Sequence, residues 1–305
     1  ELLSGDDETV NELLDTCGNL RNRLQRLRNG VEALQTGQVL SHGGSSLAMP
    51  VGEHVRMVFT LQNDPHSGQI YAAGLYRPTG QAVYGGGPLM LHEVADNPAD
   101  CARVCRDFLQ TLHGQLRILH DFNEGKDWRK QKSLQIYTFD SYELTLLNRL
   151  LLEALEDPQL APLALPMLFF FQDEQLAIQD THPESGVAFP VVVLTGVIRQ
   201  LVALPEPLVL RLPEVLRALP NPNFNYNGLR QPGELFWFEL SNTMKSDALF
   251  QLWNGKTDAH DWIQGELGRR LYAASNVVDG LREVVGKQLF AWPPKFALPG
   301  VKAFR

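Results

Sequence analysis

The chain has few cysteines and no long apolar run. Only three cysteines occur among its 305 residues. Cys101 and Cys105 lie four positions apart and Cys17 is distant, which fits neither a disulfide framework nor a zinc site. No apolar segment reaches the about 20 residues that a membrane-spanning helix needs, and no basic-then-apolar leader opens the chain. These absences exclude a membrane partner and predict a cytoplasmic protein with reduced thiols.

An excess of positive charge is also lacking. The formal net charge is −8, from 27 Lys and Arg against 35 Asp and Glu. A chain of this charge does not coat nucleic acid through a general positive field, so any contact with DNA or RNA must be local. The length allows one or two domains of ordinary globular composition.

The N-terminal region reads as a helix followed by a linker. Apolar residues recur at alternating spacings of three and four from Val10 to Leu34, which predicts a helix over residues 1–36 with a narrow apolar seam that pairs with another helix. Gly, Ser and Pro dominate residues 37–52, and we expect a linker there. The opening acidic run that leads directly into the helix predicts a segment of a longer polypeptide, although a processed N-terminus would look the same.

The segment 53–215 has the pattern of an α/β domain. Its predicted elements are strand, strand, short strand, helix, strand and helix, at residues 53–62, 69–77, 81–84, 97–119, 134–139 and 142–155. Turn residues join the first two strands at 64–68, and either Asp140 or Ser141 can cap the last helix. This order is how an RNase H-like domain begins, with a mixed sheet flanked by helices.

The remaining sequence is less regular. Residues 191–204 read as a buried helix or a strand followed by a helix, and residues 208–212 as a short strand. Residues 216–305 form a predicted C-terminal extension, in which an Asn-rich loop at 221–228 precedes a long helical pattern over 261–289.

Two short motifs resemble a known family. The segment 58–65 followed by 68–75 resembles the first hairpin of the RNase H-like, DEDD-exonuclease-type domains that bacterial proteins carry between a RecB-like nuclease and a superfamily 1 helicase. The segment 136–143 is similar to the strand-to-helix acidic motif of that family. The resemblance implies a role in DNA repair, nuclease and helicase domains of the same polypeptide as partners, and an ATP-driven motor beyond Arg305.

The first strand departs from the family pattern. Where the family places an Asp and a Glu, this chain has Thr60 and Gln62. Neither side chain supplies the anionic oxygen that a hard divalent cation requires, so the sequence predicts a degenerate metal site. An alignment shifted by two residues would instead make Asp64 the first-strand acid.

Three acids remain as candidate catalytic residues and metal ligands, namely Asp64, Asp140 and Glu143. Each has a structural alternative, because an Asp after a turn and an acid at a helix start commonly bond the local backbone. The late acid of the family pattern could be Asp258 or Asp261, and no spacing selects between them.

A local nucleic-acid surface is predicted in the connection before the fourth strand. Four cations and one indole occur together there, at Lys126, Trp128, Arg129, Lys130 and Lys132. Cations can neutralise phosphates and an indole can stack on a base. The alternative is a solvated loop in which Trp128 anchors the backbone to the core.

Three functions follow from these observations. The preferred one is a catalytically degenerate RNase H-like module of a DNA helicase–nuclease, acting as a scaffold or nucleic-acid-guiding domain and needing no cofactor. The second is an active 3'-5' exonuclease that uses Mg²⁺ or Mn²⁺ at the three acids. The third is a protein-interaction module that works through the N-terminal helix.

Overall fold

The computed structural model describes residues 24–44, 46–171, 190–205, 210–220 and 246–298. Short 3-10 turns η2 (Pro98–Asp100), η3 (Ala154–Glu156) and η6 (Gly286–Gln288) adjoin the longer elements. The strands are β1 (Leu40–Ser41), β2 (Val55–Asn63), β3 (Ile70–Arg77), β4 (Leu89–Val94), β5 (Leu134–Thr138), β6 (Val191–Val193) and β7 (Val202–Ala203). The helices are α2 (Leu24–Thr36), α3 (Gln81–Tyr84), α4 (Cys101–Asn123), α5 (Ser141–Glu153), α6 (Ala161–Phe170), α8 (Leu194–Leu201), α9 (Leu212–Ala218), α10 (Ser246–Trp253) and α11 (Thr257–Val285).

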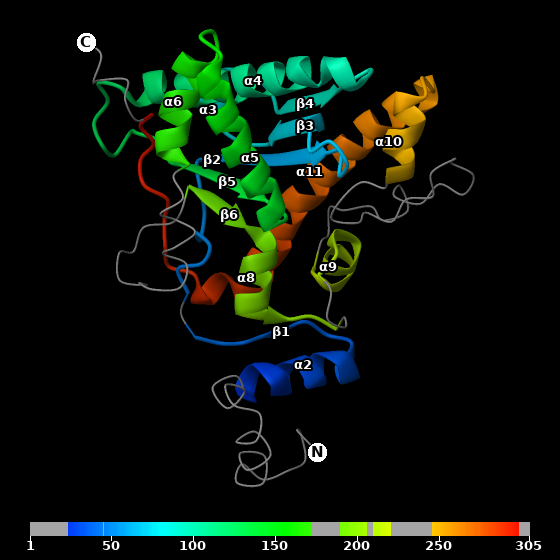
Figure 1. Cartoon of the computed structure of the whole chain (residues 1–305). Helices are drawn as coiled ribbons and strands as arrows, with labels where there is room; N and C mark the ends of the chain where they lie inside the picture. Colours follow the sequence, from blue (N-terminus) through cyan, green and yellow to red (C-terminus); the bar gives the residue numbers. More distant parts are fainter. Residues whose placement is uncertain (1–23, 45, 172–189, 206–209, 221–245, 299–305) are drawn as a thin grey trace.

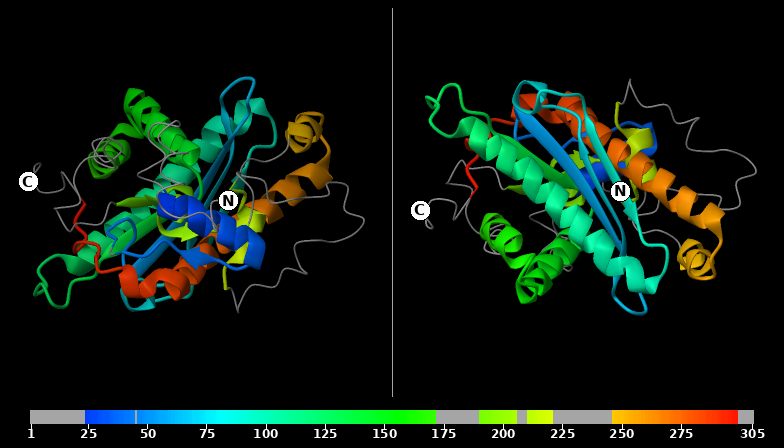
Figure 2. Two further views of the ribbon diagram at one scale, coloured as in Figure 1. Left: turned by 90° about the horizontal axis from the view of Figure 1, so that it is seen from below. Right: turned by 90° about the horizontal axis from the view of Figure 1, so that it is seen from above.

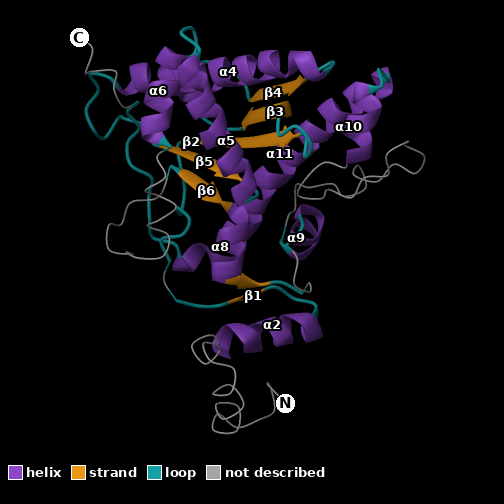
Figure 3. Cartoon of the chain, viewed as in Figure 1, coloured by secondary structure: helices purple, strands orange, loops and turns teal. Residues whose placement is uncertain are grey.

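The centre of the fold is a mixed five-stranded sheet in the order β4-β3-β2-β5-β6 (Figure 1). Strands β4, β3 and β2 are antiparallel neighbours, whereas β5 runs parallel to both β2 and β6. Helices flank this sheet, and the C-terminal part is mostly helical (Figure 3). The predicted α/β architecture, a mixed sheet flanked by helices with an N-terminal helix and a mostly helical C-terminal part, is confirmed.

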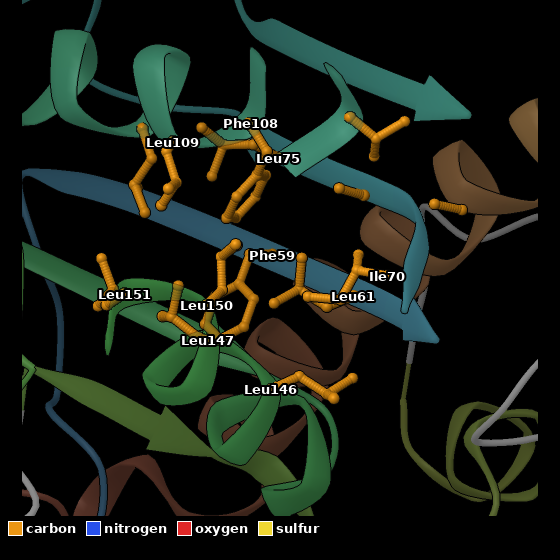
Figure 4. Close-up of a cluster of buried hydrophobic side chains, with 14 of the residues drawn as sticks. Phe59, Leu61, Ile70, Leu75, Phe108, Leu109, Leu146, Leu147, Leu150 and Leu151 are labelled. Carbon is orange, nitrogen blue, oxygen red and sulfur yellow. The ribbon is translucent and has the colours of Figure 1, made fainter. Parts of the chain in front are cut away.

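The sheet lies between two helical layers. Figure 2 shows the strands between α4 and α11. Phe59 and Leu61 of β2 pack with Phe108 of α4 and Leu147 of α5 (Figure 4). Val58 belongs to a second cluster with residues of α8, α9 and α11. Neighbouring side chains of a strand point to opposite faces, and every residue of β2 from Val55 to Gln62 is buried, so this strand is covered on both sides.

Helix α11 crosses the sheet at close range. A Cβ atom at Gly74 of β3 would lie 2.8 Å from Leu271 Cδ1, so only glycine leaves room for the helix at this crossing. Near the same line, Gly268 of α11 faces His92 of β4. This close packing brings the polar residues of α11 to the end of β2.

The predicted first, second and fourth strands are confirmed as β2, β3 and β5, and the helices predicted at 97–119 and 142–155 as α4 and α5. The short strand predicted at 81–84 is wrong, because these residues form α3 between Gly80 and Gly85, which have φ angles of 90° and 66°. The third strand is β4 instead. Its sequence does not alternate cleanly between apolar and polar residues. Leu91 packs in the core cluster with α4, whereas the next residue, His92, faces α11.

The segment predicted as a linker is packed against the body. Leu40 pairs with Ala203 in the small sheet of β1 and β7, and the Val51 N–H donates to the Ala291 carbonyl at 2.9 Å. Met49 is fully buried. Residues 37–52 therefore contact both the predicted α/β domain and the predicted C-terminal extension.

Several predictions fall wholly or partly outside the described residues. The N-terminal helix is observed from Leu24 as α2, and residues 1–23 are not described. The loop at 221–228 also lies outside the described residues. The short strand predicted at 208–212 is not observed in its described part, because Leu212 begins α9.

Among the helices of the described residues, none combines the length and apolar character needed to cross a membrane. Cys101 and Cys105 are free thiols, as predicted, and Cys17 lies outside the described residues.

Candidate functional site

The candidate site lies where β2 and β5 end and α5 begins. Asp140 caps α5, because its side chain accepts a hydrogen bond from the Tyr142 N–H at 3.1 Å. The Glu143 carboxylate completes a capping box by accepting the Asp140 N–H at 3.3 Å. The local sequence thus directs the Glu143 side chain back toward the strands.

Glu143 is held between two threonines inside the protein. The Thr138 hydroxyl donates to its Oε2 atom at 2.5 Å, and the Thr60 hydroxyl donates to Oε1 in a short contact. The Gln62 amide in turn donates to Thr60 Oγ1 at 3.1 Å. Only 4% of Glu143 is exposed. Burial raises the pKa of the Glu143 carboxyl, and the hydroxyl hydrogen bonds together with the charge of Arg270 offset only part of that rise.

Helix α11 adds a buried ion pair to the site. Arg270 Nε lies 3.1 Å from Glu266 Oε1, and these side chains are 4% and 0% exposed. Arg270 and Glu143 line one small cavity with Thr60, and its volume of about 10 Å³ has room for a single water molecule. The positive charge beside Glu143 is therefore the guanidinium of Arg270.

These residues do not fit a pair of divalent metal ions. Two-metal nucleases need several carboxylates converging around two ions. Here Thr60 and Gln62 are neutral, the Glu143 oxygens accept hydroxyl hydrogen bonds, and the guanidinium of Arg270 occupies the neighbouring space. A cavity of one water molecule leaves no room for two hydrated cations.

The three candidate acids are not brought together. Asp64 caps its own turn, where its Oδ1 accepts the His66 N–H at 2.9 Å and its Oδ2 accepts the Ser67 hydroxyl at 2.8 Å. Asp140 caps α5, and only Glu143 reaches the interior. In the described part of the chain, the one group of three or more His, Cys, Asp or Glu residues whose ligand atoms lie within 4.8 Å of one another is elsewhere, at His120, Asp121 and Glu124.

That other group is bonded within the fold. His120 Nδ1 accepts the Leu298 N–H at 3.1 Å. Asp121 Oδ1 is paired with Arg117 Nε at 2.8 Å. Both side chains therefore already have partners within the fold.

The fully buried acid of α11 is Glu266, which the sequence did not single out. Asp258 and Asp261, the two late acids that the sequence offered, are exposed near the start of α11. Glu266 and Arg270 each precede a member of the apolar series that includes Leu267 and Leu271. Their position next to the apolar residues of the helix is the sequence signal that could have identified this buried pair. Oppositely charged residues four positions apart on a helix usually lie in solvent, however, so the spacing alone predicts a surface pair.

Glu143→Gln tests the protonation of this buried carboxyl. Because the folded state raises the pKa of Glu143, it binds more protons than the unfolded state between the ordinary glutamate pKa and the raised value. The wild type should therefore lose stability as the pH rises through this window, and the uncharged glutamine should not. Urea denaturation from about pH 4 to about pH 8 measures this difference. Glu156→Gln, at an exposed acid just after α5, is the control, and wild-type and Glu143→Gln curves that ran parallel would contradict the expectation.

The predicted basic loop lies at the other end of β5. Lys132 lies two residues before Leu134, the buried first residue of that strand, whereas the Glu143 site lies beyond its last residue, Thr138. Trp128 is 69% exposed, so it does not anchor the loop to the core. Arg129 and Lys130 are also exposed.

Comparison with protein-family models, with curated proteins and with solved structures finds no match for this chain.

Proposed function

We propose that this chain is a catalytically inactive RNase H-like module of a DNA helicase–nuclease, acting as a scaffold or nucleic-acid-guiding domain in the cytoplasm. The observation that carries this proposal is the buried pairing of Arg270 with Glu266 beside Glu143, at the end of the first strand of the sheet. In an active two-metal nuclease, metal ions supply the positive charge at the reacting phosphate. Here the buried guanidinium of Arg270 lies beside Glu143, and the cavity between them, of about 10 Å³, is too small for a phosphate group.

The same observation disfavours the exonuclease alternative. An active site needs an accessible nucleophile and open metal positions. Glu143 is buried and bonded to two hydroxyl groups, while Asp64 and Asp140 serve as a turn cap and a helix cap. The helicase and nuclease domains expected from the family resemblance would then perform the chemistry, and this chain would position them or the nucleic acid.

A cleavage assay tests the proposal directly. The full 305-residue chain is incubated with end-labelled single- and double-stranded DNA in Mn²⁺ and, separately, in Mg²⁺. We expect no nucleotide release, because the site lacks converging carboxylates.

The matched control is the triple variant Asp64→Ala, Asp140→Ala, Glu143→Ala. Cleavage by the wild type that disappears in this variant would overturn the proposal and establish a metal-dependent exonuclease. Equal cleavage by both proteins would identify a contaminating nuclease, because the variant lacks every candidate ligand.

A further inference from the structure

A C-terminal segment, residues 289–298, lies beside the predicted basic loop (Figure 1). Ser133 forms an antiparallel bridge with Lys295, and the Phe296 N–H donates to the Lys132 carbonyl at 3.1 Å. The Asn123 side chain donates to the Phe296 carbonyl at 2.9 Å. These bonds join two parts of the surface that are more than 150 residues apart in the sequence.

The joined segments carry two exposed indoles, and the imidazole of His54 lies beside one of them. Trp128 is 69% exposed and Trp292 is 55% exposed. Lys295 Nζ lies 5.3 Å from the centre of the Trp128 ring, and the His54 ring centre lies 6.0 Å from that of Trp292. Trp292 also packs on Gly52, where a Cβ atom would come within 3.2 Å of the indole. These contacts hold the two indoles in place, while more than half of each Trp residue stays exposed to solvent.

Positive charge collects around these rings. Loop and C-terminal segment together place five cations here, at Lys126, Arg129, Lys130, Lys132 and Lys295. The loop contains two carboxylates, Glu124 and Asp127, and the latter caps the turn by accepting the Arg129 N–H at 2.9 Å. Burial, followed by the charges of Lys295 and Lys132, lowers the pKa of His54. The surface is thus locally basic on a chain whose net charge is −8.

We propose that these eight residues, the basic-aromatic surface, bind single-stranded nucleic acid. The surface comprises His54, Lys126, Trp128, Arg129, Lys130, Lys132, Trp292 and Lys295. The cations would contact phosphates, and Trp128 and Trp292 would stack on unpaired bases. This inference rests on the proposed function and names the ligand class of its guiding role.

The combination of groups selects this ligand over others. A duplex hides its base faces, so it would use the cations and leave the two indoles without a role. An acidic protein segment would likewise pair with the cations alone. Aromatic rings interleaved with cations match a single strand, in which each nucleotide offers one phosphate and one open base face.

The position of the surface also makes binding independent of the buried Glu143 site. The two lie beyond opposite ends of β5. A strand on the basic-aromatic surface is therefore held on the outside of the module, and substitutions in the two places should act separately.

Fluorescence anisotropy with a labelled oligothymidylate of about 12 nucleotides, close to the span of one stacking surface, tests the proposal on the full chain. Trp128→Ala and Trp292→Ala should each weaken binding about tenfold. If all five cations contact phosphates, the slope of log K against log salt should approach about −3.5. Lys130→Ala and Lys132→Ala should make that slope shallower, and a duplex of equal length should bind about tenfold more weakly or worse.

The control variants are Phe250→Ala, at a side chain of α10 that is 65% exposed, and Arg106→Ala, at an exposed cation of α4. Both should bind like the wild type, and thermal melts followed by circular dichroism should show all variants folded. No salt-sensitive binding, unchanged binding by the Trp variants, or a preference for duplex would each overturn the proposal. Displacement of the oligonucleotide by poly-glutamate at equal charge concentration would also overturn it, in favour of an acidic protein partner.

The outcome of this binding experiment can be distinguished from the outcome of the cleavage assay. Absence of both binding and cleavage would overturn this inference and leave the module as a scaffold. Metal-dependent cleavage together with binding that depends on Trp128 and Trp292 would support this surface while overturning the inactive site.

Discussion

Arg270→Met is expected to lower the free energy of unfolding by about 3–5 kcal/mol, because breaking a buried ion pair leaves an uncompensated charge in the interior. Arg270 pairs with Glu266, and its charge also acts on Glu143. Methionine keeps much of the apolar volume but leaves both carboxyl groups without this cation. Urea denaturation at neutral pH measures the loss.

Two further variants separate lost charge from lost packing. Arg269→Met removes a neighbouring arginine that is 26% exposed and 3.4 Å from the other Glu266 oxygen, and it should cost no more than about 1 kcal/mol. Adding Glu266→Gln to Arg270→Met should restore part of the stability, because the carboxylate that has lost its buried partner is then gone. A loss for Arg270→Met as small as that for Arg269→Met would contradict the role assigned to the buried pair.

Glu53→Gln should be nearly as damaging, again by about 3–5 kcal/mol at neutral pH. Glu53 is 2% exposed and lies between two guanidinium groups, with Oε1 2.8 Å from Arg56 Nε and 2.9 Å from Arg282 Nη1. The Tyr137 hydroxyl donates to its Oε2 at 2.8 Å. Glutamine keeps the shape but leaves the two arginines facing each other without an anion between them.

The cost of Glu53→Gln should depend on pH. Burial opposes the charge of Glu53, but the hydrogen bonds and charges of Arg282 and Arg56 outweigh it, so its pKa is lowered. The stabilisation is therefore present above the ordinary glutamate pKa and is lost as the pH falls through the lowered value. Denaturation curves at neutral and acidic pH should show the difference from the wild type shrinking on the acid side. Glu283→Gln, at an exposed acid beside Arg282, should show neither effect.

The sequence predicted those parts of the fold whose pattern is local. Strands β2 and β3 have turn residues between them, and α5 begins at a capping box that can be read from Asp140 and Glu143. Strand β4 was not predicted, because its sequence has three apolar residues in a row followed by His92 and Glu93 and so lacks the two-residue alternation of a strand.

The candidate sites divide in the same way. Thr60 and Gln62 were recognised as unable to hold a metal ion from their place in a short motif. Arg270, which supplies the cation of the site, follows Thr60 by more than two hundred residues. Likewise, Lys295 and Trp292 join the basic loop only through tertiary pairing with residues near Ser133. In both places the sequence showed one half of the site, and the late part of the chain supplied the other.

The crossing of α11 over the sheet has a consequence for how the chain folds. Arg56 of the first central strand bonds to Asp279 of this helix across 223 positions of sequence. Such distant contacts raise the contact order, which slows folding. During synthesis, β2 to β5 leave the ribosome well before α11. The face of the sheet that α11 covers therefore stays exposed until this helix has been made. Chaperone binding to the nascent chain should therefore be greatest in the interval before α11 leaves the ribosome.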